Sequence, residues 1–269
     1  MRPKANERPA LTTAMILAAG RGERLRPITD QCPKPLVSVA GLPLIVHHLQ
    51  RLARAGIRRV IINHAWLGAQ IEQTLKDGAP WGVHIDYSPE PPGGLETAGG
   101  IAHALPLIQA ANHHPQAPFL LVNGDVFCDF DFQAWQSCLP LSASQGGAHL
   151  LLVPTPSYKP QGDFGLVPAG SEQASTDPPD ALSGQVTDTG PWTFAGVSVM
   201  HPQWFTALRA QAESVAPAPL APLLRRGIAQ SAVTGEVYQG RWVDVGTPER
   251  LHALRASLTS QATETDTKD

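Results

Sequence analysis

The sequence predicts an α/β fold: one domain built on a mixed, mostly parallel central sheet with helices on both faces. Two observations support this class. Short apolar segments alternate with amphipathic segments between residues 13 and 125, which is the pattern of strands joined by crossover helices. The second half adds further strand-like segments with less helix between them, so the sheet is expected to be mixed.

The first half is predicted to alternate strands and helices. The first helix shows the pattern clearly, because Ile45, Leu49 and Leu52 recur at helical spacing, with Pro43 near the start and Gly56 just past the end. The predicted elements, in order, are strand 13–19, helix 43–56, strand 58–64, helix 66–78, strand 82–88, helix 96–108 and strand 117–125.

The second half is predicted to contain strands 148–154, 163–168, 193–200, 232–239 and 241–246, and helices 221–230 and 248–258. One segment interrupts this pattern. Residues 169–185, "AGSEQASTDPPDALSGQ", are polar and proline-rich with no apolar period. They fit a surface loop or hairpin excursion, and simple disorder is an equally open alternative.

Composition narrows the function classes. A hydrophobic content of 42%, a charged content of 16% and a net charge of −3 are ordinary for a soluble globular protein and favour neither a nucleic-acid nor a membrane partner. Cys32, Cys128 and Cys138 lack paired C-x-x-C spacing, so we expect reduced thiols rather than disulfides or a zinc site. No signal peptide or membrane-spanning run is visible, and we expect a cytoplasmic protein.

The segment "ILAAGRGERLRPITDQCPKPL", residues 16–36, follows the first predicted strand directly. It does not fit a Rossmann fingerprint, because Leu25 stands at the third glycine position and Pro27 would interrupt the following helix at a cost of about 3 kcal/mol. No glycine-lysine-hydroxyl triplet follows Gly20, so it is not a P-loop either. The sequence therefore predicts an extended glycine turn.

This loop is locally basic. Its cations are Arg21, Arg24, Arg26 and Lys34 and its acids are Glu23 and Asp30, which gives a charge of +2 in a protein of net charge −3. Glycines let backbone N–H groups approach an anion, and arginine offers a forked donor for phosphate oxygens. A solvated basic loop is the simpler alternative. The position at the carboxyl end of a strand, where open α/β sheets bind ligands, favours a polyphosphate site.

The loop "LAAGRGERLRPITDQCPKPL" resembles the signature of the sugar-1-phosphate nucleotidyltransferases, with L-A-A-G-x-G-x-R, P-x-T and P-K-P-L in order. The similarity continues through "GLPLIVHHL", "VNGD", "TFAGVSV" and "WVDVGTPERL" and covers residues 12–258. It implies a single Rossmann-like nucleotidyltransferase domain with a small sugar-binding subregion, and Mg²⁺-dependent nucleotidyl transfer to a sugar 1-phosphate with release of pyrophosphate. Residues 1–11 are then a polar leader and 259–269 a disordered tail.

Two aspartates are candidate Mg²⁺ ligands. Asp125 and Asp244 each follow a predicted strand, and Mg²⁺ is usually held by one or two carboxylates together with phosphates and water. Alone, each would more often be a helix cap or turn residue. The resemblance assigns both aspartates to the metal.

The same resemblance assigns the other site residues. Arg24 and Lys34 are the catalytic cations, Arg24 on the departing phosphates and Lys34 at the reacting centre. The nucleotide-binding set is Ala19, Gly20, Gly22, Glu23, Arg24, Lys34, Glu96 and Thr97, and the substrate-binding set is Asn123, Asp163 and Asp244. The family commonly has glycine or another small residue where Glu96 stands, and a role of Glu96 and Thr97 at a helix N-terminus is an equal alternative.

The segments "INHAWLGAQIE", "SPEPPGGLETAGGI" and "FLLVNGDVFCDFDF" resemble most closely the family members that transfer UMP from UTP to N-acetylmuramate 1-phosphate during recycling of cell-wall sugars. Guanylyl or thymidylyl transfer to mannose or glucose 1-phosphate is the alternative within the family. Outside it, a non-catalytic sugar-nucleotide sensor and a dinucleotide-binding oxidoreductase are considered, the latter disfavoured by Leu25 and Pro27. Hexapeptide repeats are absent from the sequence, and a monomer is expected.

Overall fold

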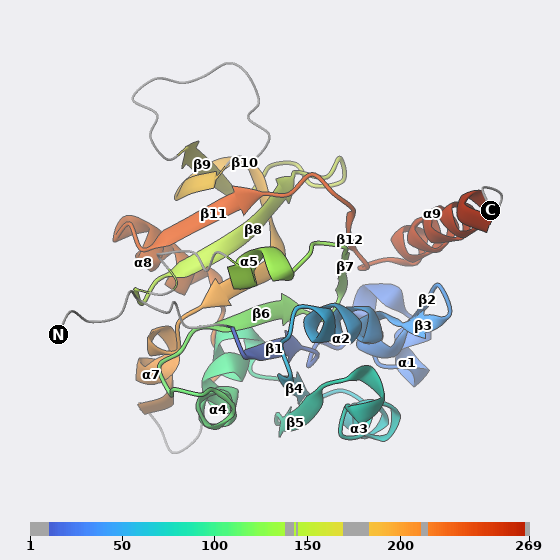
Figure 1. Ribbon diagram of the computed structural model, residues 1–269, viewed down its shortest axis with the longest axis horizontal. Coiled ribbons are helices and arrows are strands. Elements are labelled where there is room, and N and C mark those ends of the chain that lie inside the picture. Colours follow the sequence, from blue (N-terminus) through green and yellow to red (C-terminus); the bar gives the residue numbers. More distant parts are fainter. Residues whose placement is uncertain (1–10, 138–142, 144, 169–182, 211–214, 267–269) are drawn as a thin grey trace.

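An eight-stranded sheet runs through the computed structural model, with helices on both faces (Figure 1). The structure describes residues 11–137, 143, 145–168, 183–210 and 215–266. The strand order is β11 (Val233–Val237), β8 (Ala148–Pro154), β10 (Ser183–Met200), β6 (Phe119–Asn123), β1 (Thr13–Leu17), β4 (Arg59–His64) and β5 (His84–Pro89), with β9 (Phe164–Pro168) paired to β10.

The sheet is mixed and mostly parallel, which confirms the predicted fold class. Every pairing that involves β10 is antiparallel, and the pairings β1–β4, β1–β6, β4–β5 and β8–β11 are parallel. The carboxyl ends of β1, β4, β6, β8 and β11 therefore meet along one edge of the sheet. This edge is where ligand sites of open α/β sheets form.

Helices cover the sheet in two layers, because alternate strand residues face opposite sides. Ala14 and Ile16 of β1 belong to the core on one face, whereas Met15 belongs to the core on the other. The first face is covered by α2 (Leu44–Arg54), α3 (Gly68–Leu75) and α5 (Gln133–Ser137), and the second by α4 (Glu96–Ala111), α7 (Gln203–Ala210) and α8 (Ala221–Ala229).

A third apolar cluster lies beside the sheet and supports the basic loop. It joins Leu25 of the loop to Phe127, Val245 and Leu254. These residues come from β7 (Val126–Cys128), the segment after β12 (Trp242–Asp244), and α9 (Pro248–Asp266), while β2 (Ser38–Val39) and β3 (Leu42–Pro43) form a small hairpin next to it. Segments far apart in sequence are thus packed together at the loop.

The predicted elements occur, with several differences. Helix α7, the short helix α5 and the short strands β2, β3 and β7 were not predicted. The strand predicted at 193–200 is the end of an 18-residue strand that begins at Ser183, inside the predicted excursion. The rest of that excursion, residues 169–182, lies outside the described residues.

The predicted domain boundaries do not coincide with element boundaries. Leu11 is buried, and its N–H donates to Gln136 Oε1 at 2.9 Å, so the packed part of the chain includes the residue before position 12. At the other end, α9 continues through Asp266, into the segment predicted to be disordered from 259. Extending an existing helix costs much less free energy than nucleating a new one. The packed first turns of α9 therefore explain why the helix continues through these polar residues.

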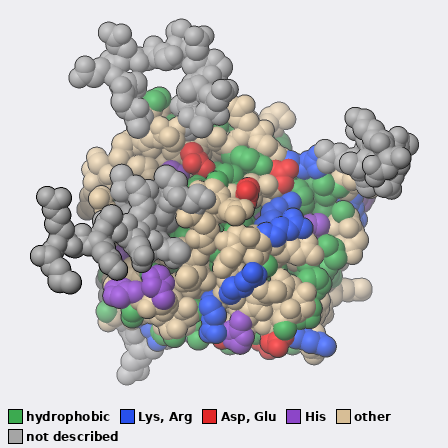
Figure 2. Space-filling model, viewed as in Figure 1, with side chains coloured by type: hydrophobic (Ala, Val, Ile, Leu, Met, Phe, Trp, Pro, Cys, Tyr) green, Lys and Arg blue, Asp and Glu red, His purple; other side chains and the backbone are tan. Residues whose placement is uncertain are grey.

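The described helices include none long and apolar enough to cross a bilayer. On the face shown in Figure 2, basic, acidic and hydrophobic side chains are interspersed among other polar ones.

Candidate active site

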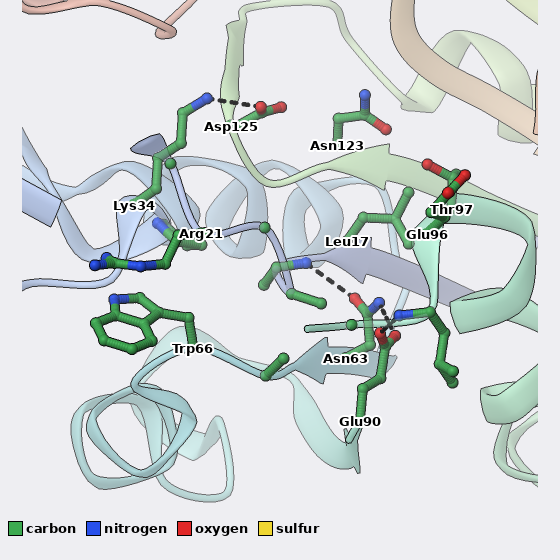
Figure 3. Close-up of a pocket in the computed structure, with 18 of the residues that line it drawn as sticks. Leu17, Arg21, Lys34, Asn63, Trp66, Glu90, Glu96, Thr97, Asn123 and Asp125 are labelled. Carbon is green, nitrogen blue, oxygen red and sulfur yellow. Dashed lines mark hydrogen bonds and ion pairs between the residues drawn. The ribbon is translucent and has the colours of Figure 1, made fainter. Parts of the chain in front are cut away.

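A cavity of about 1120 Å³ opens at the carboxyl ends of β1, β4, β5 and β6 (Figure 3). It is large enough for a nucleotide-sized ligand. Most of the predicted site residues line it, namely Ala19, Gly20, Gly22, Glu23, Arg24, Lys34, Glu96, Thr97, Asn123 and Asp125. Two predicted residues, Asp163 and Asp244, are not in its lining.

The basic loop is not an extended turn, which corrects that expectation. It folds into three single turns, η1 (Glu23–Leu25), α1 (Ile28–Gln31) and η2 (Lys34–Leu36). Gly22 precedes the first with φ of 69°, and a Cβ there would lie 3.0 Å from Thr29 Cγ2 and 3.2 Å from Lys34 Cβ. The loop therefore requires glycine at this position for both conformation and space.

Arg21 stabilises the loop internally. Its Nη1 donates to the Thr29 carbonyl at 2.9 Å and its Nη2 to Asp30 Oδ1 at 3.0 Å. The guanidinium also lies over the Trp66 ring at 3.5 Å, and Trp66 Nε1 donates to the same Thr29 carbonyl (Figure 3). Arg24, by contrast, is an exposed member of the cavity lining and has no ion pair among the described residues. Arg24 is the loop arginine that is available to a ligand.

Lys34 and Asp125 form an ion pair inside the cavity. Lys34 Nζ donates to Asp125 Oδ2 at 2.7 Å, and the lysine side chain is only 8% exposed (Figure 3). The aspartate is positioned by Gly124, whose N–H donates to the Leu17 carbonyl at 2.8 Å. A Cβ on Gly124 would come within 2.7 Å of that carbonyl oxygen, so the "NGD" sequence needs its glycine.

The second predicted metal ligand, Asp244, lies next to the first. Strand β12 pairs with β7 so that Asp244 is opposite Val126, and the Val245 N–H donates to the Asp125 carbonyl at 3.0 Å. Asp244 Oδ2 accepts a hydrogen bond from Arg250 Nη1 at 2.7 Å.

Asp244 reaches the cavity edge through Gly246, which lines the cavity. A Cβ on Gly246 would lie 2.9 Å from Asp244 Oδ1 and 3.0 Å from Arg24 Nη2. Arg24, Asp125 and Asp244 are therefore brought to one end of the cavity from three distant parts of the chain.

The two aspartates fit a Mg²⁺ site. In each aspartate, Oδ2 accepts a hydrogen bond from a cationic side chain. Together the two carboxylates supply the hard oxygen donors that Mg²⁺ prefers. Among the described residues, no group of three or more His, Cys, Asp or Glu side chains could hold a metal. Mg²⁺ in phosphate sites is usually held by one or two carboxylates together with the ligand phosphates and water, so this pair is sufficient.

Asn63 and Glu90 form a brace that the sequence predictions missed. Asn63 Oδ1 accepts from the Ala18 N–H at 2.9 Å, and its Nδ2 donates to Glu90 Oε1 at 2.6 Å. Glu90 Oε2 accepts from the Leu95 N–H at 2.7 Å (Figure 3). The brace ties the loop after β1 to the segment before α4. Polar residues at the ends of β4 and β5 were the signal, of the same kind as the strand-end position that pointed to Asp125.

Glu96 and Asp163 differ from the other predicted residues. Glu96 is exposed and has φ of 55°, a left-handed conformation that favours glycine, at the first position of α4. Asp163 is bound elsewhere, because its Oδ1 accepts from Lys159 Nζ at 2.6 Å and its Oδ2 from the Phe194 N–H at 3.0 Å. A contact between Asp163 and a sugar stays a prediction.

The two cysteines that the structure describes, Cys32 and Cys128, are poorly suited to act as nucleophiles. Burial raises the pKa of the Cys128 thiol to about 11 and also raises the pKa of Cys32, so both favour the neutral thiol. Both are free cysteines, and Cys138 lies outside the described residues.

Comparison with known proteins gives consistent results. The sequence matches the nucleotidyl transferase family over residues 13–261. It is 50% identical over 246 residues to the N-acetylmuramate alpha-1-phosphate uridylyltransferase of Neisseria meningitidis serogroup B, covering 90% of this chain and 96% of that protein. It is 29% identical over 260 residues to the protein of the same name from Caulobacter vibrioides, covering 91% and 96%.

A solved structure shows the same fold. The crystal structure of a UDP-glucose pyrophosphorylase with UDP-glucose superposes with a TM-score of 0.66 at 15% identity, covering 93% of this chain and 99% of that one. The family match extends over nearly the whole chain and includes the basic loop and both aspartates. The chain therefore belongs to the nucleotidyl transferase family and is a nucleotidyltransferase.

Proposed function

We propose that the protein transfers UMP from UTP to N-acetylmuramate 1-phosphate, with Mg²⁺, giving UDP-N-acetylmuramic acid and pyrophosphate. The observation that carries the proposal is the 50% identity to a uridylyltransferase of that specificity over 96% of its length. The proposed product is a cell-wall sugar nucleotide, which fits a role in peptidoglycan recycling in the cytoplasm. We also propose that the protein acts as a monomer.

The cavity suits this chemistry. A phosphate oxygen of the sugar 1-phosphate attacks the α-phosphorus of the nucleotide, the bond from that phosphorus to the bridging oxygen breaks, and pyrophosphate leaves. The nucleophile is already ionised near neutral pH, so the protein must chiefly align the two anions and neutralise their charge. Lys34 and Arg24 supply that positive charge inside the cavity.

Each group of residues has a proposed task. Lys34 orients the phosphates at the reacting centre, and Arg24 binds the departing phosphates. Bound at Asp125 and Asp244, Mg²⁺ would supply charge neutralisation for the phosphate oxygens. Asn123 is proposed to contact the sugar phosphate from the end of β6.

The nucleotide is proposed to lie between the two segments joined by the Asn63–Glu90 brace. Backbone N–H groups of residues 19–22 face its phosphates, and the segment from Pro92 to Thr97 faces its base. The brace fixes the distance between these two segments, so it positions the nucleotide without touching the reacting atoms.

Pyrophosphate release tests the proposal directly. The purified protein is incubated with Mg²⁺ and each of UTP, GTP and dTTP against N-acetylmuramate, N-acetylglucosamine, mannose and glucose 1-phosphates. Release that is fastest with UTP and N-acetylmuramate 1-phosphate supports the proposal. Preference for GTP with mannose 1-phosphate or dTTP with glucose 1-phosphate would keep the reaction class and reject the substrates.

A further inference from the structure

A second cavity, of about 400 Å³, lies on the same edge of the sheet as the first. Val153 and Pro154 at the carboxyl end of β8 line it, together with Gln239 and Gly240 just after β11. Strand β8 runs parallel to β6, because both are antiparallel to the β10 strand between them. The two cavities are therefore neighbours, with their strands β6 and β8 about 10 Å apart, two strand spacings.

The lining of the second cavity is mainly apolar with one cation. Val153, Pro154, Trp242 and Leu254 contribute apolar surface. The charged member of the described lining is Arg250, from the first turn of α9. An apolar hollow with a single arginine suits a small ligand group that combines hydrocarbon with a carboxylate.

Arg250 connects the two cavities. Its side chain is 16% exposed, and its guanidinium lies over the Tyr158 ring at 4.3 Å. Nη1 donates to Asp244 Oδ2. Nη2 lies in the space that a Cβ on Gly246 would occupy, and Gly246 lines the first cavity. Arginine has five N–H donors in a fixed plane, so the bond to Asp244 leaves donors for a second anion. Stacking on Tyr158 holds that plane in one orientation.

The carboxylates near this cavity are paired with cations. Asp244, which follows the lining residue Val243, pairs with Arg250 at 2.7 Å, and Asp163, five residues after Tyr158, pairs with Lys159 at 2.6 Å. Because the nucleotide is proposed to lie between the segments joined by the brace, we place the sugar of the sugar 1-phosphate on the side of Asn123 and Gly246, toward β8. The group that distinguishes N-acetylmuramate from N-acetylglucosamine is a lactyl ether, which consists of a methyl-bearing carbon and a carboxylate.

We propose that the second cavity receives the lactyl group of the sugar and that Arg250 binds its carboxylate, which makes Arg250 the residue that selects an acidic sugar phosphate. The proposal rests on the proposed function above. The methyl group packs against Val153 and Trp242, and the carboxylate replaces water at the guanidinium of Arg250.

The experiment compares two sugar phosphates on two enzymes. kcat/KM is measured with UTP and either N-acetylmuramate 1-phosphate or N-acetylglucosamine 1-phosphate, for the wild type and for Arg250→Gln. Both rates fall in the variant, because Asp244 loses its partner. The rate with the acidic sugar falls roughly 10- to 100-fold further, the cost of losing a hydrogen bond to a charged group. Arg255→Gln is the matched control, since Arg255 lies on the same helix and bonds the Ser38 carbonyl.

The outcomes separate the two proposals. Equal losses for both sugars in Arg250→Gln would show that Arg250 acts only through Asp244 and would overturn the inference. A wild type that does not prefer the acidic sugar would overturn the proposed function itself. Arg250→Lys, which keeps the charge without the planar fork, should recover part of the preference for the acidic sugar. Circular dichroism melting curves establish whether each variant is folded. If Arg250→Gln is not folded, the sugar preference of Arg250→Lys provides the test instead.

Discussion

The ion pair between Lys34 and Asp125 determines the charge at the proposed reaction centre. Lys34 is nearly buried, so an ammonium there has given up most of its water and depends on the carboxylate, or on a ligand phosphate, for compensation. The sequence could predict both residues, because each stands at a strand end or in the loop. It could not predict that they pair, since they are 91 positions apart and neither segment determines the order of the strands in the sheet.

Replacing either member of this pair should reduce turnover severely. We expect Lys34→Ala and Asp125→Asn each to lower kcat/KM for UTP by about 100-fold or more, because each removes charge stabilisation at the transferred phosphate. In a double-mutant cycle the losses should be far from additive, since the residues touch. Additive losses, or a wild-type rate in either single variant, would contradict the assigned roles.

The brace through Glu90 makes a separate prediction. Glu90→Gln offers one acceptor oxygen where two donors, Asn63 Nδ2 and the Leu95 N–H, now converge. One donor must lose its bond, so unfolding free energy should fall by about 1–3 kcal/mol and KM for UTP should rise. Urea unfolding and steady-state kinetics measure both effects. Glu72→Gln should change KM little, because the half-exposed Glu72 pairs with the buried His64 outside the cavity.

At the scale of elements, α4 begins in a conformation that its sequence does not favour. Glu96 has φ of 55°, where a side chain costs about 1 kcal/mol relative to glycine. Such a conformation at the edge of a cavity is held by its surroundings, here by the Leu95 N–H bond to Glu90.

Glu96→Gly should therefore stabilise the protein by up to about 1 kcal/mol, although it introduces glycine into a helix. Gln73→Gly on the exposed side of α3 should instead destabilise it by about 0.5–1 kcal/mol. Thermal melts of both variants measure this contrast. An unchanged KM for UTP in Glu96→Gly would show that the side chain does not read the base, whereas a large increase would support the predicted nucleotide contact.

The local elements were predictable from sequence, and their arrangement was not. Strands β1, β4 and β6 each contain an apolar run, AMIL, VII and FLLV, so their burial is visible in the sequence. The brace depends on the register of β4 and β5, which places Asn63 beside Ser88, two residues before Glu90. Register between parallel strands is set by the packing of the connecting helix, and no local pattern records it. The same holds for the reversed direction of β10 and the pairing of β12 with β7.

At the scale of the whole molecule, a buried histidine couples stability to pH. His48 on α2 is completely buried, and its Nε2–H donates to the Val126 carbonyl at 2.7 Å. Burial lowers the pKa of His48 to about 4 from the usual 6.5. The nearby charges of Arg51 and His47 lower the pKa further, and the hydrogen bond to Val126 opposes part of the shift. The neutral imidazole is therefore the folded form at neutral pH.

Stability should fall as pH decreases from 6.5 to 4. In this range the unfolded chain takes up a proton at His48 and the folded protein does not, so acid favours unfolding, by roughly 3 kcal/mol in total. Below pH 4 both states bind the proton and this contribution no longer changes. His48→Gln, which keeps a donor for Val126, should flatten the dependence measured by urea unfolding at pH 7 and pH 5. His252→Gln, exposed on α9, should leave it unchanged.

The cation on each aspartate has a consequence for the order in which ligands arrive. Lys34 balances Asp125 and Arg250 balances Asp244, so a divalent ion that enters alone meets carboxylates that are already neutralised. We expect a triphosphate, with its excess negative charge, to draw Lys34 toward itself and so to release an Asp125 oxygen for the ion. We expect calorimetry to show weak Mg²⁺ binding to the free protein and much tighter binding once UTP is present. Mg²⁺ and UTP are then expected to bind cooperatively, each raising the affinity of the protein for the other.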